Sequence, residues 1–281
     1  MSKTVTIIGV GLIGGSLALS LKEHGLADHV IGIDNNESHL EKAYQLKLID
    51  EKGTLEEAVK RSKLIVLAIP VDMMQDLLPH ILDMVEDQVV IDMGSTKNHI
   101  TKLLVTHPKR GRFVATHPMW GTEYSGPEAA VSGAFVNKAA IICNIEDSDP
   151  DALELVKDMY KKIGMHLVYM EAHAHDIHAA YVSHIAHITS FALANTVLEK
   201  EKEDQAIFAL ASAGFESTVR LAKSNPSMWV PIFRENRDNV LDVLNEHISQ
   251  LKKFKSCLEK DNYDYLNELI VKANGIRRII S

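Results

Sequence analysis

Short apolar runs alternate with segments of helical periodicity through the first part of the chain. The strand-like runs span residues 5–8, 30–33, 64–69, 89–91, 113–115 and 139–143, and the helix-like segments include 12–24, 37–46 and 73–85. A last helix at 151–162 and a strand at 167–169 complete the series. This alternation predicts an α/β domain with a doubly wound parallel sheet and crossover helices.

From about Glu171 the pattern changes, because apolar residues then recur at spacings of three and four and no β-branched run follows. We therefore predict an all-helical C-terminal domain. No Gly/Ser-rich linker separates the two domains, residues 1–171 and 172–281, so we expect a continuous helix to join them, starting near Ala172. The junction is the expected cleft.

The composition fits two ordinary globular domains. The chain has 281 residues, more than one compact core usually holds. Of these residues 46% are hydrophobic and 24% are charged, a balance that leaves no room for a large disordered tail. The net charge of −8 argues against nucleic acid as a partner, since phosphate binding needs clustered Lys and Arg. We expect no membrane segment and no signal peptide. Cys143 and Cys257 lack metal-site spacing, which favours a reducing cytoplasm.

A glycine-rich turn follows the first strand-like run and opens the first helix. Its sequence, Gly9-Val-Gly11-Leu12-Ile13-Gly14, has G-x-G-x-x-G spacing. Gly9 permits a tight turn, Gly11 lets the backbone approach a pyrophosphate, and Gly14 lets helix and strand pack closely. Leu12 and Ile13 begin a helix whose N-terminus faces the phosphate charge. The glycines alone could be without function, but their place between strand and helix indicates a Rossmann-type domain.

An acidic residue at the end of the second strand-like run indicates which dinucleotide binds. Asp34 lies about twenty residues beyond Gly14, where its carboxylate can accept hydrogen bonds from the adenosine ribose. It would repel a 2′-phosphate, so we expect NAD rather than NADP; FAD fits a chain this short less well. Ile69 and Pro70 should run under the cofactor, although Pro70 could equally start a helix.

Two polar clusters follow later strand-like runs, Asp92-Met-Gly-Ser95-Thr-Lys97 and Thr116-His117-Pro-Met-Trp-Gly-Thr122-Glu123. Both should lie at the carboxyl edge of the sheet. With Asp176-x3-Ala180-x2-Ser183-His184-x2-His187, Gly214-Phe215-x4-Arg220 and Ser227-Met-Trp229, they make the chain resemble the prephenate dehydrogenase family. The five elements stand in the family's order and cover almost the whole chain.

The resemblance implies oxidative decarboxylation of prephenate to 4-hydroxyphenylpyruvate and CO2 with NAD, in tyrosine biosynthesis. His117 matches the catalytic histidine, a neutral imidazole that accepts a hydrogen bond from the substrate hydroxyl. Ser95 matches the serine that binds the same hydroxyl, and Arg220 matches the arginine that clamps a carboxylate. The further matches at the substrate site are Thr122, Glu123, His184 and His187. Glu216, Ser217 and Val219 depart from the family pattern beside Arg220.

Purely structural roles are the alternative for several of these residues. His117 could be a buried histidine bonded to a loop carbonyl, Ser95 could cap a helix that begins near Thr96, and Arg220 could be a surface side chain. We expect Trp229 to be a core or interface anchor rather than a catalytic group.

A polar stripe marks the helix that follows Ala172. Asp176, Ala180, Ser183 and His187 fall within about 60° of one another, with His184 at the margin. The opposite side should pack into the helical core, leaving the stripe to face the nucleotide-binding domain; that side holds Ile177, Tyr181, Ile185 and Ile188. A metal cluster of His173, His175, His178, His184 and His187 is disfavoured, because no H-E-x-x-H motif or carboxylate set accompanies it.

Alternative functions stay open beside the leading one. Arogenate dehydrogenase differs only in the substrate side chain, while related hydroxyacid or imine reductases use a lysine in the helical domain. A catalytically silent NAD sensor would lack the set Ser95, His117, His187 and Arg220. The resemblance also implies a homodimer through the helical domain, and no regulatory or chorismate mutase domain is expected within these residues.

Overall fold

The structure is a computed structural model that describes residues 3–202, 207 and 210–279. It divides into two compact units, Met1–Asn236 and Arg237–Ser281.

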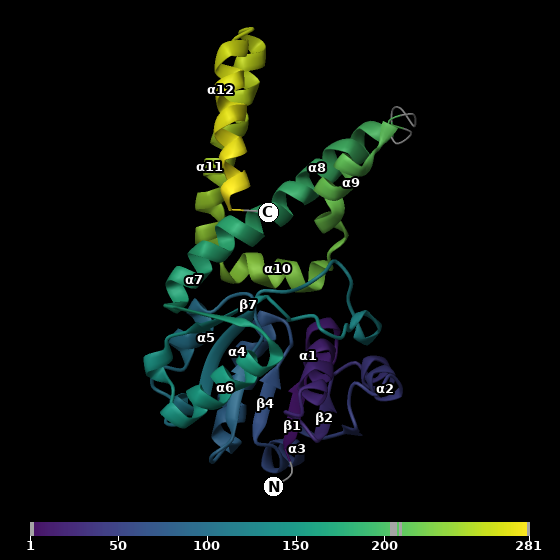
Figure 1. The fold of residues 1–281 in the computed structure, drawn as a ribbon, viewed down its shortest axis with the longest axis vertical. Helices are drawn as coiled ribbons and strands as arrows, with labels where there is room; N and C mark the ends of the chain where they lie inside the picture. Colours follow the sequence, from purple (N-terminus) through teal and green to yellow (C-terminus); the bar gives the residue numbers. More distant parts are fainter. Residues whose placement is uncertain (1–2, 203–206, 208–209, 280–281) are drawn as a thin grey trace. The chain divides into compact units, whose positions relative to one another are not determined.

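One sheet forms the centre of the first unit (Figure 1). It has eight strands in the order β3-β2-β1-β4-β5-β6-β7-β8. The strands are β1 (Thr4–Ile8), β2 (His29–Ile33), β3 (Glu51–Lys52), β4 (Leu64–Leu67), β5 (Val89–Asp92), β6 (Phe113–Pro118), β7 (Ala139–Cys143) and β8 (His166–Met170). The chain reverses its direction of travel across the sheet between β1 and β4, which is the switch point where dinucleotides bind in such folds. The predicted doubly wound α/β fold is confirmed, and the two-residue β3 is the one described strand that was not foreseen.

The expectation of a fully parallel sheet is wrong at one edge. Strands β1 to β6 pair in parallel, but β7 runs antiparallel to β6, and β8 is parallel to β7. The link from β6 to β7 contains only the short 3₁₀ turn η2 (Pro127–Ala129), where a parallel neighbour needs a crossover helix. The chain therefore returns in the opposite direction.

Helices cover both faces of the sheet. They are α1 (Leu12–Glu23), α2 (Glu37–Gln45), α3 (Leu55–Arg61), α4 (Val71–Met84), α5 (Asn98–Leu103) and α6 (Pro150–Ile163). Leu17 of α1 and Tyr160 of α6 share one apolar core with Val66. Leu78 of α4 and Leu104, just after α5, share the other with Leu67. Successive residues of β4 thus face opposite cores, as in a strand buried on both sides.

A continuous helical run leaves the sheet at Ala172, as predicted. It consists of α7 (Ala172–Ala179), the π turn η4 (Ala180–His184) and α8 (Ile185–Glu201). The helices α9 (Ala213–Val219) and α10 (Pro226–Glu235) follow, with the 3₁₀ turn η6 (Arg220–Lys223) between them. Trp229 and Ile232 of α10 are buried with Val71 at the start of α4, which fixes α10 against the nucleotide-binding part of this unit.

The apolar side of this helix, expected to pack into a helical core, is only partly buried. Tyr181 is 48% exposed, whereas Asp176 and His184 are buried. A π turn takes more residues per turn than an α-helix, so it brings His184 round to the side of Asp176. Buried polar partners, described below, hold that side inward.

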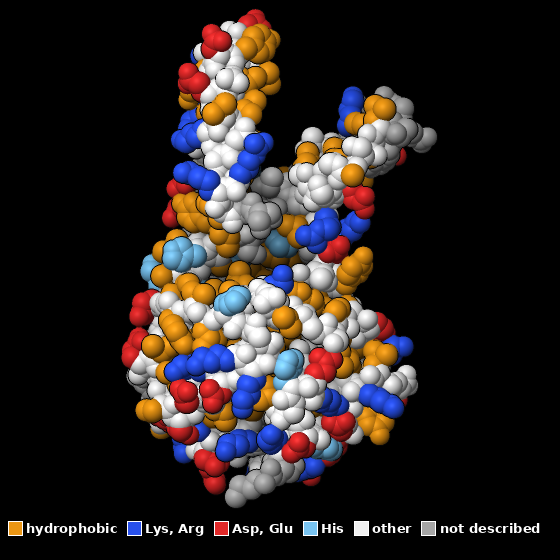
Figure 2. Space-filling model, in the orientation of Figure 1, with side chains coloured by type: hydrophobic (Ala, Val, Ile, Leu, Met, Phe, Trp, Pro, Cys, Tyr) orange, Lys and Arg blue, Asp and Glu red, His pale blue; other side chains and the backbone are white. Residues whose placement is uncertain are grey.

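The second unit contains α11 (Arg237–Glu259), α12 (Tyr263–Ala273) and the 3₁₀ turn η7 (Asn274–Arg278). Val240, Val243 and Cys257 are buried in it. Figure 2 shows hydrophobic side chains exposed along this helical pair. Leu251, Leu258 and Val271 are each more than half exposed. No strand follows β8 in the described part of the chain, so the predicted all-helical C-terminal region is confirmed. Within that same part, no helix is both long and apolar enough to span a membrane.

Candidate active site

The glycine turn between β1 and α1 has the close contacts that the motif predicts. Gly9 has φ +92°, and a Cβ there would lie 2.4 Å from the carbonyl oxygen of Ala68. A Cβ on Gly14 would lie 1.9 Å from the carbonyl oxygen of Gly9. A Cβ on Gly11 would meet nothing nearer than the backbone nitrogen of Gly126, at 4.0 Å. The turn is therefore packed on its inner side and open at Gly11, where α1 begins.

Asp34 lies immediately after β2, beside the glycine turn. Its carboxylate accepts hydrogen bonds from the backbone N–H of Val10 at 3.0 Å and of Asn36 at 2.9 Å. Ile69 follows β4, and its side chain lies against Gly9. Pro70 is the N-cap residue of α4, so the helix-start alternative describes it correctly. The accessible backbone at the N-terminus of α1 suits a pyrophosphate. The half-buried carboxylate of Asp34 suits the ribose joined to it.

His117 lies near the carboxyl end of β6, at the same edge of the sheet, and is 9% exposed. Its Nδ1 lies 2.8 Å from Nε2 of His175, whose Nδ1 lies 2.7 Å from Oδ1 of Asp176. Burial lowers the pKa of His117 well below its usual 6.5, and the neighbouring His175, Lys97 and His184 lower it further. His117 is therefore neutral at pH 7, which is the state that accepts a hydrogen bond.

A buried ion pair lies under this group. The ammonium of Lys97 contacts Oδ2 of Asp92, and both side chains are fully buried. Asp92 also accepts hydrogen bonds from the backbone N–H of Gly94 at 2.9 Å and of Thr116 at 3.1 Å. These bonds tie the end of β5 to β6, one residue before His117. A paired, hydrogen-bonded buried charge of this kind fixes the position of the loop around it.

Ser95 lies half-buried in the loop between β5 and α5. The alternative that it caps the next helix is wrong. The first N–H groups of α5 are satisfied by Asp176, which accepts from the backbone of Lys97 at 2.8 Å and of Asn98 at 2.9 Å. The hydroxyl of Ser95 is not used as the cap.

His184 and His187 take different positions on the helical run. His184 is fully buried, and its Nδ1 accepts a hydrogen bond from the amide of Asn236 at 3.1 Å. Burial is the main cause that lowers the pKa of His184 to about 4. His187 is partly buried and stacks on Trp229, with ring centroids 3.4 Å apart. Trp229 is 6% exposed, which confirms its expected role as a core anchor.

Arg220 projects from η6 and pairs with Glu123, with Nη1 and Oε2 2.7 Å apart. The arginine side chain is 50% exposed and the glutamate 10%. Burial lowers the pKa of His187, and the charge of Arg220 contributes in the same direction. Thr122 accepts a hydrogen bond from the backbone N–H of Tyr124 at 3.3 Å. The loop after β6 thus brings Glu123 to the helical side of the site.

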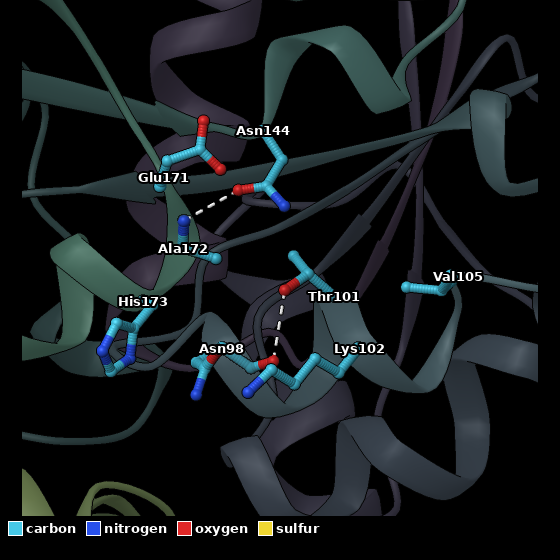
Figure 3. A pocket seen from close by; sticks show the side chains of 8 residues that line it. All are labelled: Asn98, Thr101, Lys102, Val105, Asn144, Glu171, Ala172 and His173. Carbon is cyan, nitrogen blue, oxygen red and sulfur yellow. Dashed lines mark hydrogen bonds between the residues drawn. The ribbon is translucent and has the colours of Figure 1, made fainter.

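A cavity of about 200 Å³ lies beside α5 and the start of α7 (Figure 3). Its walls are formed by Asn98, Thr101, Lys102, Val105, Asn144, Glu171, Ala172 and His173. None of the site residues predicted from the sequence lines it. Among residues 3–202, 207 and 210–279, no group of three or more His, Cys, Asp or Glu side chains could hold a metal ion.

The contacts of four residues of the site were not predicted from the sequence: Lys97, His175, Asp176 and Asn236. The adjacent His175–Asp176 pair was visible in the sequence, but it was considered only as part of a metal cluster or a polar stripe. Asn236 donates one hydrogen bond to the carbonyl of Asp176 at 2.7 Å and one to His184. No local pattern marks such a residue, because its partners lie over fifty positions away.

A Rossmann domain with an open glycine turn, a carboxylate beside it and a neutral histidine at the same sheet edge defines a dinucleotide-dependent dehydrogenase. Two family models match the chain: "Prephenate dehydrogenase, nucleotide-binding domain" over residues 17–169, and "Prephenate dehydrogenase, dimerization domain" over residues 171–272. The chain belongs to the prephenate dehydrogenase family, as its motifs predicted.

Individual relatives agree with this assignment. The chain is 31% identical over 281 residues to the prephenate dehydrogenase of Bacillus subtilis (strain 168), covering 99% of this chain and 76% of the relative. It is also 31% identical to a cyclohexadienyl dehydrogenase of Zymomonas mobilis, covering 98% and 95% of the two chains. A crystal structure of Aquifex aeolicus prephenate dehydrogenase with hydroxyphenyl propionate and NAD+ superposes with a TM-score of 0.91 at 30% identity, covering 100% of this chain and 99% of that one.

Proposed function

We propose that this chain catalyses the NAD-dependent oxidative decarboxylation of prephenate to 4-hydroxyphenylpyruvate and CO2, a step of tyrosine biosynthesis. The observation that carries the proposal is the place of His117, a neutral, buried imidazole at the sheet edge that also holds the glycine turn. Similarity to the Bacillus subtilis prephenate dehydrogenase over 99% of this chain supports it. The related hydroxyacid and imine reductases, and a silent NAD sensor, fit this combination less well.

The cofactor site uses backbone more than side chains. Gly11 and the N-terminus of α1 would hold the pyrophosphate, with Leu12 and Ile13 as the first helical residues there. Asp34 would accept the ribose hydroxyls, and Ile69 and Pro70 would line the floor. NAD bound there would supply the acceptor for the hydride that leaves the ring carbon bearing the hydroxyl. Asp34 favours NAD over NADP, because a 2′-phosphate would meet its negative charge.

The reaction requires a hydrogen-bond acceptor of the protein at the substrate hydroxyl. As the hydride leaves, positive character builds on the hydroxyl-bearing carbon, and a hydrogen-bond acceptor at the hydroxyl stabilises it. His117 would provide that acceptor, with Ser95 as a second contact to the same oxygen. The bond from the ring to the carboxylate then breaks, and its electron pair completes the aromatic ring. The product keeps the hydroxyl proton, so His117 needs to share it only while the charge develops.

The substrate's carboxylates require positive or neutral donors. Arg220 would bind one of them as a planar, permanently charged fork, in exchange for its present partner Glu123. His187, close enough for the charge of Arg220 to lower its pKa, would contribute a second polar contact. We assign Thr122 and His184 supporting contacts around the same space. Glu216, Ser217 and Val219, which depart from the family pattern, lie on α9 directly before Arg220.

The proposal also covers the roles of the two domains, the oligomeric state and the cellular compartment. Residues 1–171 would bind NAD, and residues 172–281 would complete the substrate site and form a homodimer through their exposed apolar helices. Size-exclusion chromatography with light scattering tests the dimer, and a monomer at micromolar concentration would contradict it. We place the protein in the cytoplasm, a reducing compartment that fits the free thiols of Cys143 and Cys257.

The test of the proposed function is steady-state turnover of the purified chain. With prephenate and NAD we expect NADH and 4-hydroxyphenylpyruvate to form in equal amounts. The same assay with arogenate measures the alternative substrate, a second candidate that the similarity to the structure of Synechocystis arogenate dehydrogenase supports (25% identity, TM-score 0.76). A kcat/KM for arogenate above that for prephenate would make arogenate the assigned substrate. If neither acid gave NADH, the proposal would be refuted.

A further inference from the structure

The ring of His117 has two nitrogens, and one of them is hydrogen-bonded to a described residue. Its Nδ1 faces Nε2 of His175 at 2.8 Å, while no described residue bonds Nε2 of His117. His175 itself is 1% exposed, and its own Nδ1 faces Asp176. The three side chains therefore form one chain of hydrogen bonds that ends on the ring of His117.

The direction of every bond in this chain follows from its last member. A carboxylate can only accept, so Nδ1 of His175 carries a proton and donates it to Asp176. A neutral His175 then has an unprotonated Nε2, which must accept from Nδ1–H of His117. A doubly protonated His175 would instead donate from Nε2 and move the proton of His117 to its own Nε2, so the tautomer of His117 distinguishes the two arrangements.

We propose that His175 is a positioning residue that, together with Asp176, holds His117 in the tautomer with its proton on Nδ1, leaving Nε2 to accept the substrate hydroxyl. This inference rests on the proposed function. An imidazole without such a partner can carry its proton on either nitrogen and can rotate. In the wrong tautomer, His117 would present a donor to a group that also donates.

Asp176 is itself held in place from the other side. Its Oδ1 accepts from the backbone N–H of Lys97 as well as from His175, and its Oδ2 accepts from that of Asn98. These two N–H groups begin α5, directly after the loop that carries Ser95. The carboxylate thus connects the start of α5, which follows the loop that carries Ser95, to the histidine that contacts His117.

Three variants separate positioning from bulk packing. H175F removes the acceptor and the donor but keeps a buried ring, so we expect an unchanged Kd for NAD and a kcat lower by up to roughly 10⁴-fold, the loss known for a catalytic histidine in the wrong tautomer. H175Q keeps an amide oxygen that can accept from His117 and an NH2 that can donate to Asp176, so it should recover most of that loss. H173F, at an exposed position two residues earlier on α7, is the matched control and should keep wild-type kcat.

The tautomer is measured directly by ¹⁵N NMR of histidine-labelled protein without substrate. We expect an unprotonated Nε2 and a protonated Nδ1 for His117 in wild type and H175Q, and a mixture in H175F. A protonated Nε2 in wild type would overturn the inference, as would H175F with wild-type kcat or a folded H175Q as slow as H175F. Because the spectrum needs no turnover, a wild-type chain that shows the expected tautomer but does not oxidise prephenate would refute the proposed function and leave the inference standing.

Discussion

Replacing Gly11 with alanine tests the cofactor site without disturbing the fold. The backbone at Gly11 has φ −75°, which alanine adopts freely, and its Cβ would have no neighbour closer than 4.0 Å. Loss of glycine at a helix N-cap costs about 1 kcal/mol or less, or about 2–4 °C in Tm for a chain of this size. The methyl group would, however, fill the space through which the backbone approaches the pyrophosphate. Losing a hydrogen bond to a charged group costs about 1.5–3 kcal/mol, so the Kd for NAD should rise roughly 10- to 100-fold.

Calorimetric titration with NAD and a thermal melt of the same sample measure both quantities. Gly14→Ala is the opposite case, because its Cβ would lie 1.9 Å from a backbone oxygen, and we expect it to lower Tm strongly. Gly275→Ala, in the second unit, meets only a side-chain atom at 3.6 Å and serves as the control with wild-type affinity. If Gly11→Ala bound NAD within twofold of wild type, the pyrophosphate could not lie against this turn.

Four further predictions follow from the site. His117→Asn should keep its affinity for NAD and lose roughly 10²- to 10⁴-fold in kcat, measured by NADH formation; near wild-type turnover would remove His117 from its role. Arg220→Ala should mainly raise KM for prephenate, and an unchanged KM would mean that another group holds the carboxylate. Burial lowers the pKa of His117, so kcat/KM should persist as pH falls through 6.5 and decline only at lower pH, and an acid limb at or above pH 7 would contradict this. Wild-type enzyme should prefer NAD to NADP in kcat/KM, and the reverse preference would contradict the role of Asp34.

The same depressed pKa has a consequence for stability. Below about pH 6.5 the unfolded chain takes up a proton at His117 that the folded chain does not, so stability falls as pH falls. His184, with its pKa lowered to about 4, acts in the same direction.

The strands and the glycine turn could be predicted because their signals are local. Apolar runs marked β1, β2 and β4 to within a few residues, and the spacing of Gly9, Gly11 and Gly14 specified a turn that only glycine allows. The direction of β7 could not be predicted in this way. An apolar run has the same pattern in either direction, and only the lack of a crossover helix between β6 and β7 decides it.

The hydrogen bonds around His117 could not be predicted, because they join residues that lie far apart in the sequence. His175 contacts a residue 58 positions away, and the π turn moves His184 off the position that regular helical spacing gives it. Asp176 was correctly placed on the side that faces the nucleotide-binding part. Its role as the cap of α5 depends on two backbone N–H groups that carry no sequence signal of their own.

The most direct test of the account is a crystal structure of this chain with NAD and hydroxyphenyl propionate. We expect Nε2 of His117 to lie about 2.6–3.2 Å from the phenol oxygen, on the side of the ring away from the nicotinamide or at its edge. Nδ1 of the same ring should remain on His175. A phenol oxygen bonded to a different acceptor, with His117 turned away from it, would contradict the account.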